Sequence, residues 1–398
     1  MLGRQSDKTV NKWVWVGIPG SSVAIMVVAS LSGHPLAGSG AAVIGLCAFA
    51  AWWNPDRAKK QRRPVVQQEP QFKVASDTDS LIRDMLAQGR SALLVRDQTA
   101  KMLDAEQQTV ALESLHKEMA LVPSGEVYLQ SRAVIEHPDQ PRDYQILQVD
   151  AYYLDRYTVT NEQFYRFVEA GGYQQANLWD EEVSPDTFDF LDQTGALGPR
   201  FWRDGKYLVN SELHPVVGIT WYEARAYSRW VGKRLPTDPE WVKAGAWPIP
   251  TSSVPKQRKY PWGDQLDADR ANLWDSDIGR TVPVTEYIRG ASAAGHHQLV
   301  GNVWEWTCDE FGQWDSPQAK IHLAVELRAI RGAAFDTYFE TESNCQFQSG
   351  EYPLSRRHNI GFRCALSATD LSIVDPEDPA SEVHNEDNNQ PQGTTHTG

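Results

Sequence analysis

The sequence predicts an α+β domain with little regular secondary structure, preceded by a two-helix transmembrane hairpin and a helical connector. Three observations lead to this prediction. Two uncharged apolar stretches near the N-terminus each have the length of a membrane-spanning helix. Further along the chain, three threonines open capping boxes, which mark the starts of short helices. Between these helices lie long stretches rich in Gly, Pro, Trp and Asp, which contain only short strand patterns.

The composition excludes several classes of function. The chain of 398 residues has a formal net charge of -14 and only one short basic cluster, so no nucleic-acid partner is expected. Its four cysteines are Cys47, Cys308, Cys345 and Cys364. They are too scattered for a disulfide framework and show no zinc-binding spacing. The adjacent pair His296-His297 is interpreted as part of an exposed loop, since neighbouring side chains rarely point at one metal ion.

Two N-terminal stretches, residues 13–31 and 35–53, contain no charged side chain, and each can cross a bilayer as a helix. The segment between them contains Gly and Pro and predicts a turn, so the spans form a hairpin over 13–53. Tryptophans lie at the start of the first span and at the end of the second, where interfacial aromatic residues belong. A cleaved signal peptide fits poorly because a second apolar stretch follows. The predicted partner of the hairpin is the lipid bilayer.

The charges that flank the hairpin predict its orientation. Residues 1–12 and 57–63 carry Lys and Arg, whereas the loop between the spans carries neither. The positive-inside rule therefore places both ends in the cytoplasm. We expect an integral protein of a bacterial inner or plasma membrane, with a cytoplasmic N-terminus at 1–12 and a large cytoplasmic domain. If only one stretch spans the bilayer, the large domain is extracytoplasmic instead.

Three further segments flank the large domain. Residues 54–75 form a basic, Pro/Gln-rich linker, and residues 76–118 show a helical apolar pattern that predicts a connector of two or three helices. The apolar stripe of this connector either packs against the following domain or pairs protomers as a homo-oligomer. Residues 367–398 are acidic, contain no Lys or Arg, and predict a disordered tail.

Residues 119–366 contain a series of motifs that occur in one order. They are Val122–Gly125, Tyr157–Phe164, His214–Ala224, Gly232–Trp241, Tyr260–Asp264, Gly301–Trp306 and Gly361–Arg363. Together these motifs resemble the sulfatase-modifying-factor, or formylglycine-generating enzyme, family. The resemblance implies a variant C-type-lectin-like fold with low regular secondary structure. It also marks the stretch from Gln298 to Cys364, whose ends carry the last two motifs, as the place for chemistry or recognition.

Family members that oxidise a substrate cysteine to formylglycine use a copper-binding cysteine pair, and the resemblance locates those positions here. The first corresponds to Thr337, and the second falls near Thr341 or Glu342. A hydroxyl and a carboxylate cannot replace two soft thiolates around Cu(I). Cys345 and Cys364 correspond to non-catalytic positions. The prediction is therefore that copper and the oxidase chemistry are absent, with no catalytic residue to assign.

The resemblance also implies two calcium sites built from hard oxygen donors. The residues of the first are Val300, Gly301, Val303 and Glu305, with backbone oxygens from the first three and the carboxylate of the last. The residues of the second are Asn272, Leu273, Ile278 and an aspartate, Asp277 or Asp275. The second segment is shifted and shortened relative to the family pattern. A cytoplasmic location would also keep free Ca²⁺ scarce.

An alternative to calcium exists at Glu305. This carboxylate lies between Trp304 and Trp306, and a charge among indoles cannot remain unpaired without a large cost. The alternative is a buried salt bridge, with Arg331 or Arg363 as the partner.

The segment 336–355 is the predicted recognition surface, because it combines aromatic anchors with acidic groups. The predicted ligand-binding residues are Tyr338, Phe339, Glu340, Glu342, Phe347 and Tyr352. This mixture suits a basic peptide or a protein partner. The alternative is an ordinary loop whose aromatic side chains turn into the core.

Three hypotheses of function follow. The first is a membrane-anchored, non-catalytic protein- or peptide-binding module, a regulatory pseudoenzyme built on the family scaffold. The second is an enzyme, either a divergent formylglycine-generating-type oxidoreductase or another metal-dependent enzyme of the superfamily; no His/carboxylate triad at iron-ligand spacing supports it. The third is a structural membrane anchor for a larger assembly, in which the helices of 76–118 carry the interaction.

Overall fold

The computed structural model describes residues 78–130, 144–181, 183, 190–247, 257–315 and 323–372. All of them belong to one compact unit, Phe72–Gly398. The predicted hairpin at 13–53, the linker at 54–75 and most of the predicted tail lie outside the described residues. Within the part of the chain that is described, no helix has the length and apolar character needed to cross a membrane.

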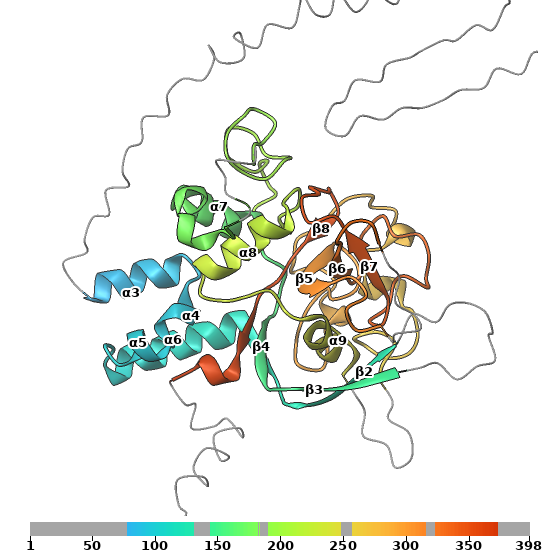
Figure 1. Cartoon of the computed structure of the whole chain (residues 1–398), viewed down its shortest axis with the longest axis horizontal. Helices are drawn as coiled ribbons and strands as arrows, with labels where there is room; N and C mark the ends of the chain where they lie inside the picture. The colour runs from blue at the N-terminus through green and yellow to red at the C-terminus, as the bar shows by residue number, and fades with distance from the viewer. Residues whose placement is uncertain are drawn as a thin grey trace, which may run out of the picture. The chain divides into compact units, whose positions relative to one another are not determined.

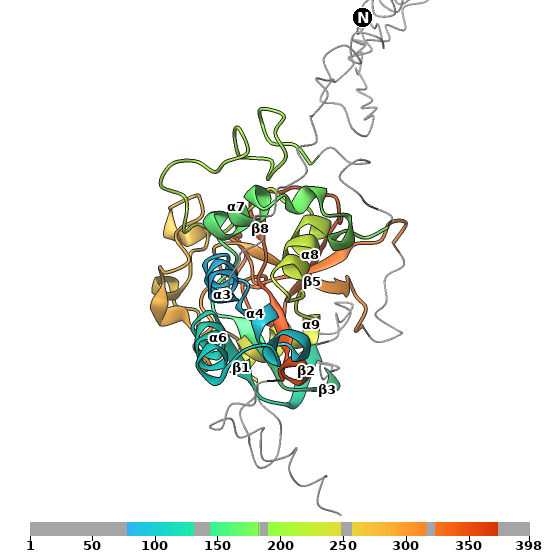
Figure 2. The same cartoon turned by 90° about the vertical axis from the view of Figure 1, so that its left-hand side faces the viewer.

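The predicted connector is a group of four helices. They are α3 (Thr78–Ala87), α4 (Ser91–Leu94), α5 (Asp97–Ala100) and α6 (Ala105–Glu118). Figures 1 and 2 show them gathered on one side of the unit, next to β1 (Met119–Val122). Their apolar residues, Ile82, Leu94 and Leu115 among them, form a second core together with Tyr153 and Leu366 of the large domain. The stripe therefore packs against the following domain. Pairing between protomers through these helices stays a prediction.

Charged groups also join the helices to the domain. The Lys233 ammonium group is almost completely buried, 3.1 Å from the Glu118 carboxylate at the end of α6 and 2.9 Å from Asp155. Arg90 donates a hydrogen bond to the Trp230 carbonyl at 3.0 Å. The helices are thus a part of the domain's architecture, since a buried ammonium group requires its carboxylate partners.

The strands form three small sheets. The first has the order β1-β4-β9, with β4 at Tyr152–Asp155 and β9 at Ala365–Ser367, and both pairings are antiparallel. The second is the hairpin of β2 (Gly125–Gln130) and β3 (Tyr144–Val149). The third has the order β7-β6-β5-β8, with β7 at Gln348–Glu351, β6 at Arg328–Arg331, β5 at Trp304–Glu310 and β8 at Ile360–Gly361. Only β5 and β8 are parallel among these described pairs.

Three helices begin where the capping boxes predicted. They are α7 (Asn161–Glu169), α8 (Trp221–Trp230) and α9 (Asp238–Ala246). In each, the threonine hydroxyl accepts from the backbone N–H three residues on, and the Gln or Glu side chain there accepts from the threonine N–H. Both partners of each capping box lie within one helical turn, so the capping box forms without any tertiary contact. The remaining short turns are 3₁₀ helices: η1 (Gly172–Gln174), η2 (Ala176–Leu178), η3 (Ala268–Arg270), η4 (Trp274–Ser276), η5 (Ile288–Gly290) and η6 (Ala368–Asp370).

Much of the aromatic content lies in the main core. Phe164 of α7 stacks on Tyr227 of α8 with ring centroids 5.5 Å apart, and Phe362 meets Tyr227 edge-on at 5.4 Å. Trp241 and Trp306 are completely buried. Large aromatic side chains fill the space between short helices and small sheets, where extended regular packing is lacking. The result is an α+β unit with much ordered loop, as the sequence predicts.

Candidate functional site

The Glu305 carboxylate in β5 forms a buried ion pair with Arg363. Arg363 donates from Nε to Oε2 at 2.7 Å and from Nη2 to Oε1 at 2.6 Å. The Trp241 indole donates a third hydrogen bond to Oε2 at 2.8 Å. Both charged side chains are fully buried. The pairing arises because β8 lies parallel to β5, with Glu305 opposite Gly361, two residues before Arg363.

This geometry bears on the first predicted calcium site. Three N–H groups already bind the carboxylate of Glu305, and two of them come from a cation. A calcium ion at this carboxylate would have to displace Arg363 or share the site with its charge. The Gly301 carbonyl also accepts the Val303 N–H at 2.9 Å. The donor set of the described residues therefore fits an arginine better than Ca²⁺, and calcium at this position stays a prediction.

Arg331, the other partner considered for Glu305, binds elsewhere. It lies opposite Glu305 in the register of β5 and β6, but its guanidinium group forms a two-pronged pair with Asp238 at the start of α9. Its Nη1 also donates to the Gln346 carbonyl at 2.7 Å. Each of the two buried arginines thus has its own carboxylate.

The two predicted calcium segments lie against each other. The Asn302 N–H donates to the Asn272 carbonyl at 2.8 Å, and a Cβ added to Gly301 would come within 2.7 Å of that same oxygen. The Asn272 side chain binds Ser276 and Asn302, so it closes the loop internally. Ile278 is partly exposed, and Asp277 has a left-handed backbone with φ 55°. No group of three or more His, Cys, Asp or Glu side chains in the described ranges is arranged to hold a metal ion.

Thr337, at the family's first cysteine position, has a structural contact. Its hydroxyl accepts a hydrogen bond from the Ala334 N–H at 2.9 Å, and the residue is buried. This contact closes a turn that follows Gly332, whose backbone has φ 102°. A Cβ at Gly332 would lie 2.5 Å from the Leu299 carbonyl oxygen. The turn is therefore held close to the β5 side of the site, where only glycine fits.

The described cysteines, Cys308, Cys345 and Cys364, are free thiols. Cys345 and Cys364 are fully buried, and burial raises the pKa of both thiols. Burial also raises the pKa of the half-buried Cys308 thiol. The Thr337 hydroxyl is a hard oxygen donor, whereas Cu(I) prefers soft thiolate ligands. The residues around Thr337 therefore do not fit the copper ion that the family resemblance implies.

An exposed aromatic cluster, which we define as Trp274, Tyr338 and Phe339, lies next to Thr337. Tyr338 and Phe339 directly follow Thr337 in the chain, and Trp274 comes from η4. The three side chains have relative exposures of 55 %, 67 % and 60 %. Tyr338 meets Trp274 edge-on with ring centroids 6.0 Å apart, and it meets Phe339 edge-on at 5.3 Å. The Trp274 N–H also approaches the Thr337 carbonyl at 3.4 Å. Three large rings that pack on each other in solvent form an unusual apolar surface.

An acidic group borders the cluster. Glu340 accepts hydrogen bonds from the Lys259 ammonium group at 3.0 Å and from the Tyr260 hydroxyl at 3.1 Å. These bonds, first that of Lys259 and then that of Tyr260, lower the pKa of Glu340. Tyr260 is fixed in turn, because its ring stacks on Trp262 with centroids 5.3 Å apart. The carboxylate is thus ionised at neutral pH and anchored beside the exposed rings.

The other predicted recognition residues lie differently. Phe347 packs against the main core and contacts Trp304, so it matches the alternative of an inward-facing aromatic residue. Tyr352 is exposed just beyond the end of β7, and no contact joins it to the cluster. The Glu342 N–H donates to the Phe339 carbonyl in a turn. Trp274 was missed as a surface residue, because its segment was interpreted as calcium ligands and lies far from 338 in the sequence.

The histidine pair is not the exposed loop that the sequence suggested. His296 is completely buried, and its Nδ1 lies 3.0 Å from the Ser292 hydroxyl. Burial and then the nearby Arg363 charge lower the pKa of His296 to about 3. The His297 ring stacks on Tyr157 at 4.7 Å, and its carbonyl accepts from Arg363. The loop is drawn inward because it supplies acceptors to the arginine.

The chain is similar to several known proteins. The chain is 37% identical over 243 residues to the hercynine oxygenase of Mycobacterium tuberculosis, a match that covers 57% of this chain and 55% of that protein. It is 29% identical over 251 residues to the inactive C-alpha-formylglycine-generating enzyme 2 of Bos taurus, covering 55% of this chain and 78% of that protein. The solved structure of PvdO from Pseudomonas aeruginosa aligns with a TM-score of 0.42 and 21% identity, over 63% of this chain and 94% of PvdO.

The chain spans just over half the length of the mycobacterial relative. The family model that matches describes a sulfatase-modifying factor enzyme 1-like domain, and it covers residues 105–368, from the start of α6 to the end of the first core sheet. This range contains the buried pair of Glu305 and Arg363 and the exposed aromatic cluster. The protein therefore belongs to the sulfatase-modifying factor enzyme 1-like domain family.

Proposed function

We propose that this protein is a membrane-anchored, non-catalytic module that binds a protein or peptide through the exposed aromatic cluster. The observation that supports this most is the cluster itself, because two of its rings, Tyr338 and Phe339, occupy the segment where family oxidases place their cysteine pair. Rigid aromatic side chains contribute large contact areas at little entropic cost, and they are typical anchors of protein interfaces. Here they stand beside Glu340, a carboxylate held in place by Lys259 and Tyr260.

The proposed partner is a peptide segment with a basic side chain next to an apolar one. Both hydrogen bonds to Glu340 end on its Oε1, so its Oε2 can accept from a basic side chain, while the rings of Trp274 and Tyr338 offer a face for apolar or cation–π contact. The formal charge of -14 favours the approach of a basic partner as well.

A peptide array tests this proposal with the full-length chain. The array presents matched basic, neutral and acidic peptides with and without an aromatic or aliphatic residue. We expect binding to the basic-apolar peptides and its loss in the double variant Tyr338→Ala, Phe339→Ala. Tyr352→Ala is the matched control, because Tyr352 is exposed but lies outside the cluster. Equal binding by the double variant and the control would overturn the assigned surface.

Metal-dependent oxidation is the second candidate, and the observation that favours it is the similarity to the mycobacterial hercynine oxygenase. The match covers about half of that relative, so it does not transfer the relative's activity as a whole. Metal analysis of the purified full-length chain separates the candidates: stoichiometric copper or iron would favour the enzyme. Calcium binding stays a prediction. Stoichiometric calcium in the same metal analysis, and a fall in the melting temperature when a chelator is added, would support it.

The membrane anchor is proposed from residues 13–53 alone. Deleting these residues should release the protein from the membrane fraction, while a protease added to spheroplasts should leave the large domain intact if it is cytoplasmic. Cleavage of the domain from outside would support the single-span alternative. If the protein is instead a structural anchor, the double variant Leu81→Ser, Met102→Ser, which changes two exposed apolar residues of segment 76–118 and leaves its core contacts intact, should abolish assembly, while the Tyr338→Ala, Phe339→Ala variant assembles normally.

A further inference from the structure

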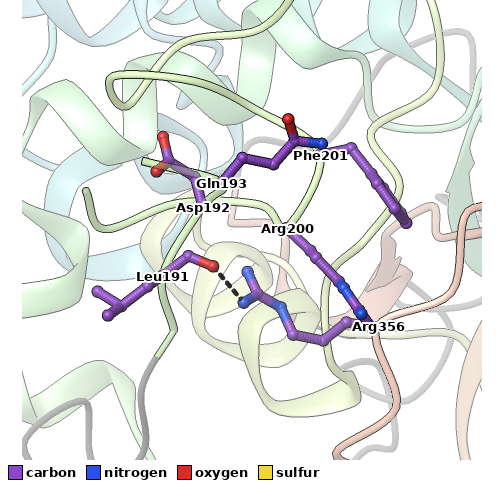
Figure 3. Close-up of a pocket in the computed structure, with 6 residues that line it drawn as sticks. All are labelled: Leu191, Asp192, Gln193, Arg200, Phe201 and Arg356. Carbon is purple, nitrogen blue, oxygen red and sulfur yellow. Dashed lines mark hydrogen bonds between the residues drawn. The ribbon is translucent and has the colours of Figure 1, made fainter. Parts of the chain in front are cut away.

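A hollow lies at residues 191–201, on the loop that follows η2, and is separate in sequence from the aromatic cluster. It has a volume of about 530 Å³, within the range of small-molecule sites. Its lining residues are Leu191, Asp192, Gln193, Arg200, Phe201 and Arg356. Figure 3 shows that the Arg356 guanidinium group is directed at the Leu191 carbonyl.

The walls of this hollow are held in place by hydrogen bonds. Arg356 donates to the carbonyls of Leu191 at 2.8 Å, Gly198 at 2.5 Å and Gly218 at 3.0 Å, and so ties three segments together. Its weaker contact with Glu223 is 3.4 Å long. Arg356 is therefore a structural cation whose donors are already used.

The acidic group of the lining is also fully used. Asp192 accepts from the backbone N–H groups of Thr194, Ala196 and Gly205 and from the Thr194 hydroxyl. Although burial opposes the charged form, these hydrogen bonds lower the pKa of Asp192. The Asp192 carboxylate binds the amides of its own loop and so stabilises that loop. The charged groups that remain in the lining are the two arginines, which give the hollow a cationic character.

Arg200 differs from the other charged groups of the lining. Its side chain is exposed, and its contact is with the neighbouring Phe201 ring, whose centroid lies 6.0 Å from the guanidinium carbon. No ion pair joins it to a carboxylate among the described residues. Phe201 itself is seated on Gly218, where an added Cβ would lie 2.5 Å from the ring. The Arg200 guanidinium group, which has no acidic partner in the part of the chain that is described, thus stands next to a fixed aromatic ring.

From this arrangement we infer that the hollow is a binding site for a small organic monoanion with one carboxylate and a flat apolar body. A guanidinium group binds a carboxylate with two parallel hydrogen bonds, a geometry that planar acids match. Phe201 and Leu191 provide the apolar contact for the remainder of the ligand. Arg200, which has no acidic partner among the described residues, selects one negative charge, because the Arg356 guanidinium group already donates to three carbonyl groups.

Benzoate is the probe, and ligand-observed NMR titration of the full-length chain is the measurement. Benzamide has the same shape without the charge, and acetate has the charge without the ring. We expect benzoate to bind at least about tenfold more tightly than either, because a charge-assisted hydrogen-bonded pair is involved. Binding of benzamide as tight as that of benzoate, or no binding of benzoate up to its solubility limit, would overturn the inference.

Three variants make the test specific. Arg200→Gln should remove the preference for benzoate over benzamide, while Phe201→Ala should weaken benzoate and benzamide together. Arg357→Gln is the matched control: it removes one positive charge from the next residue after Arg356, and its side chain pairs with Glu351 instead. Melting temperatures verify that each variant is folded. An unchanged preference in Arg200→Gln, or an equal loss in Arg357→Gln, would contradict the assignment.

Discussion

The stretch from Gln298 to Cys364 contains two regions that differ in burial. Acidic and aromatic residues are buried at its two ends and exposed in the part between them. At its ends, Glu305 and Arg363 are fully buried and satisfy each other among indole rings. In its interior, Tyr338 and Phe339 are mostly exposed, and the adjacent Glu340 pairs with Lys259 in solvent. The ends therefore contribute to stability, whereas the interior contributes a surface. The buried ion pair stabilises the framework without involving residues 338–340, so these residues can differ without loss of the fold.

The largest effect should come from the buried pair. Glu305→Gln leaves the Arg363 charge without a carboxylate in a dry interior, and the expected loss in unfolding free energy is about 3–5 kcal/mol. Urea denaturation of the full-length chain measures it. Glu340→Gln is the matched control at residues 338–340, where the ion pair with Lys259 is exposed to solvent and contributes little to stability. Similar losses in both variants would remove the distinction between the two regions.

Acid should destabilise the fold through His296, which lies just before this stretch and close to Arg363. Its pKa is about 3 in the folded protein, below the ordinary value of 6.5, so the unfolded state takes up a proton first as the pH falls. Its contribution to stability is full above pH 6.5 and declines as the pH falls toward about 3, by up to about 1.4 kcal/mol per pH unit. The contribution of His296 is the difference in the pH dependence of the unfolding free energy between the wild type and His296→Leu. If the unfolding free energy changes equally with pH in both proteins below pH 6, the prediction is wrong.

The turn that joins the two regions should be sensitive to a single methyl group. Gly332→Ala combines a left-handed backbone with a close approach to the Leu299 carbonyl oxygen, and should cost about 2 kcal/mol or more. Gly279→Ala is the control, because Gly279 also has a positive φ but no atom within 4 Å of an added Cβ. It should cost about 1 kcal/mol. Equal costs would show that the close approach does not matter.

The smallest effect on stability is expected in the interior. Tyr338→Ala and Phe339→Ala remove exposed rings, so each should change the unfolding free energy by less than about 0.5 kcal/mol. Thermal and urea denaturation verify this, alongside the peptide measurements described above. A loss of several kcal/mol would mean that the exposed aromatic cluster supports the fold, and it would weaken the case for a recognition surface.

Local features of this fold could be predicted from the sequence. Each capping box joins residues three apart, such as Thr160 and Gln163, so the pattern contains both partners of the interaction. The ordered motifs predicted the family and the α+β class for the same reason, since each is a short continuous stretch. The need of Glu305 for a partner was also evident, because its two indole neighbours are adjacent in the chain.

Contacts between distant segments could not be predicted in this way. From the sequence, Arg331 and Arg363 were equal candidates for the ion-pair partner of Glu305. The partner is Arg363, because β8 lies parallel to β5 and brings Arg363 to the carboxylate. Trp274 joins Tyr338 only because the loop around η4 lies against the turn after Thr337. Likewise, His296 is buried because its loop supplies a carbonyl to Arg363.

The sequence by itself thus determined the helix starts, the family and the requirement for a cation at Glu305, since these depend on residues close together along the chain. Only the tertiary structure decided which arginine meets that requirement, which rings form the exposed cluster and that Arg200 lacks an acidic partner among the described residues. The physical reason is that burial and long-range pairing depend on how separate segments pack, and no local pattern encodes that packing.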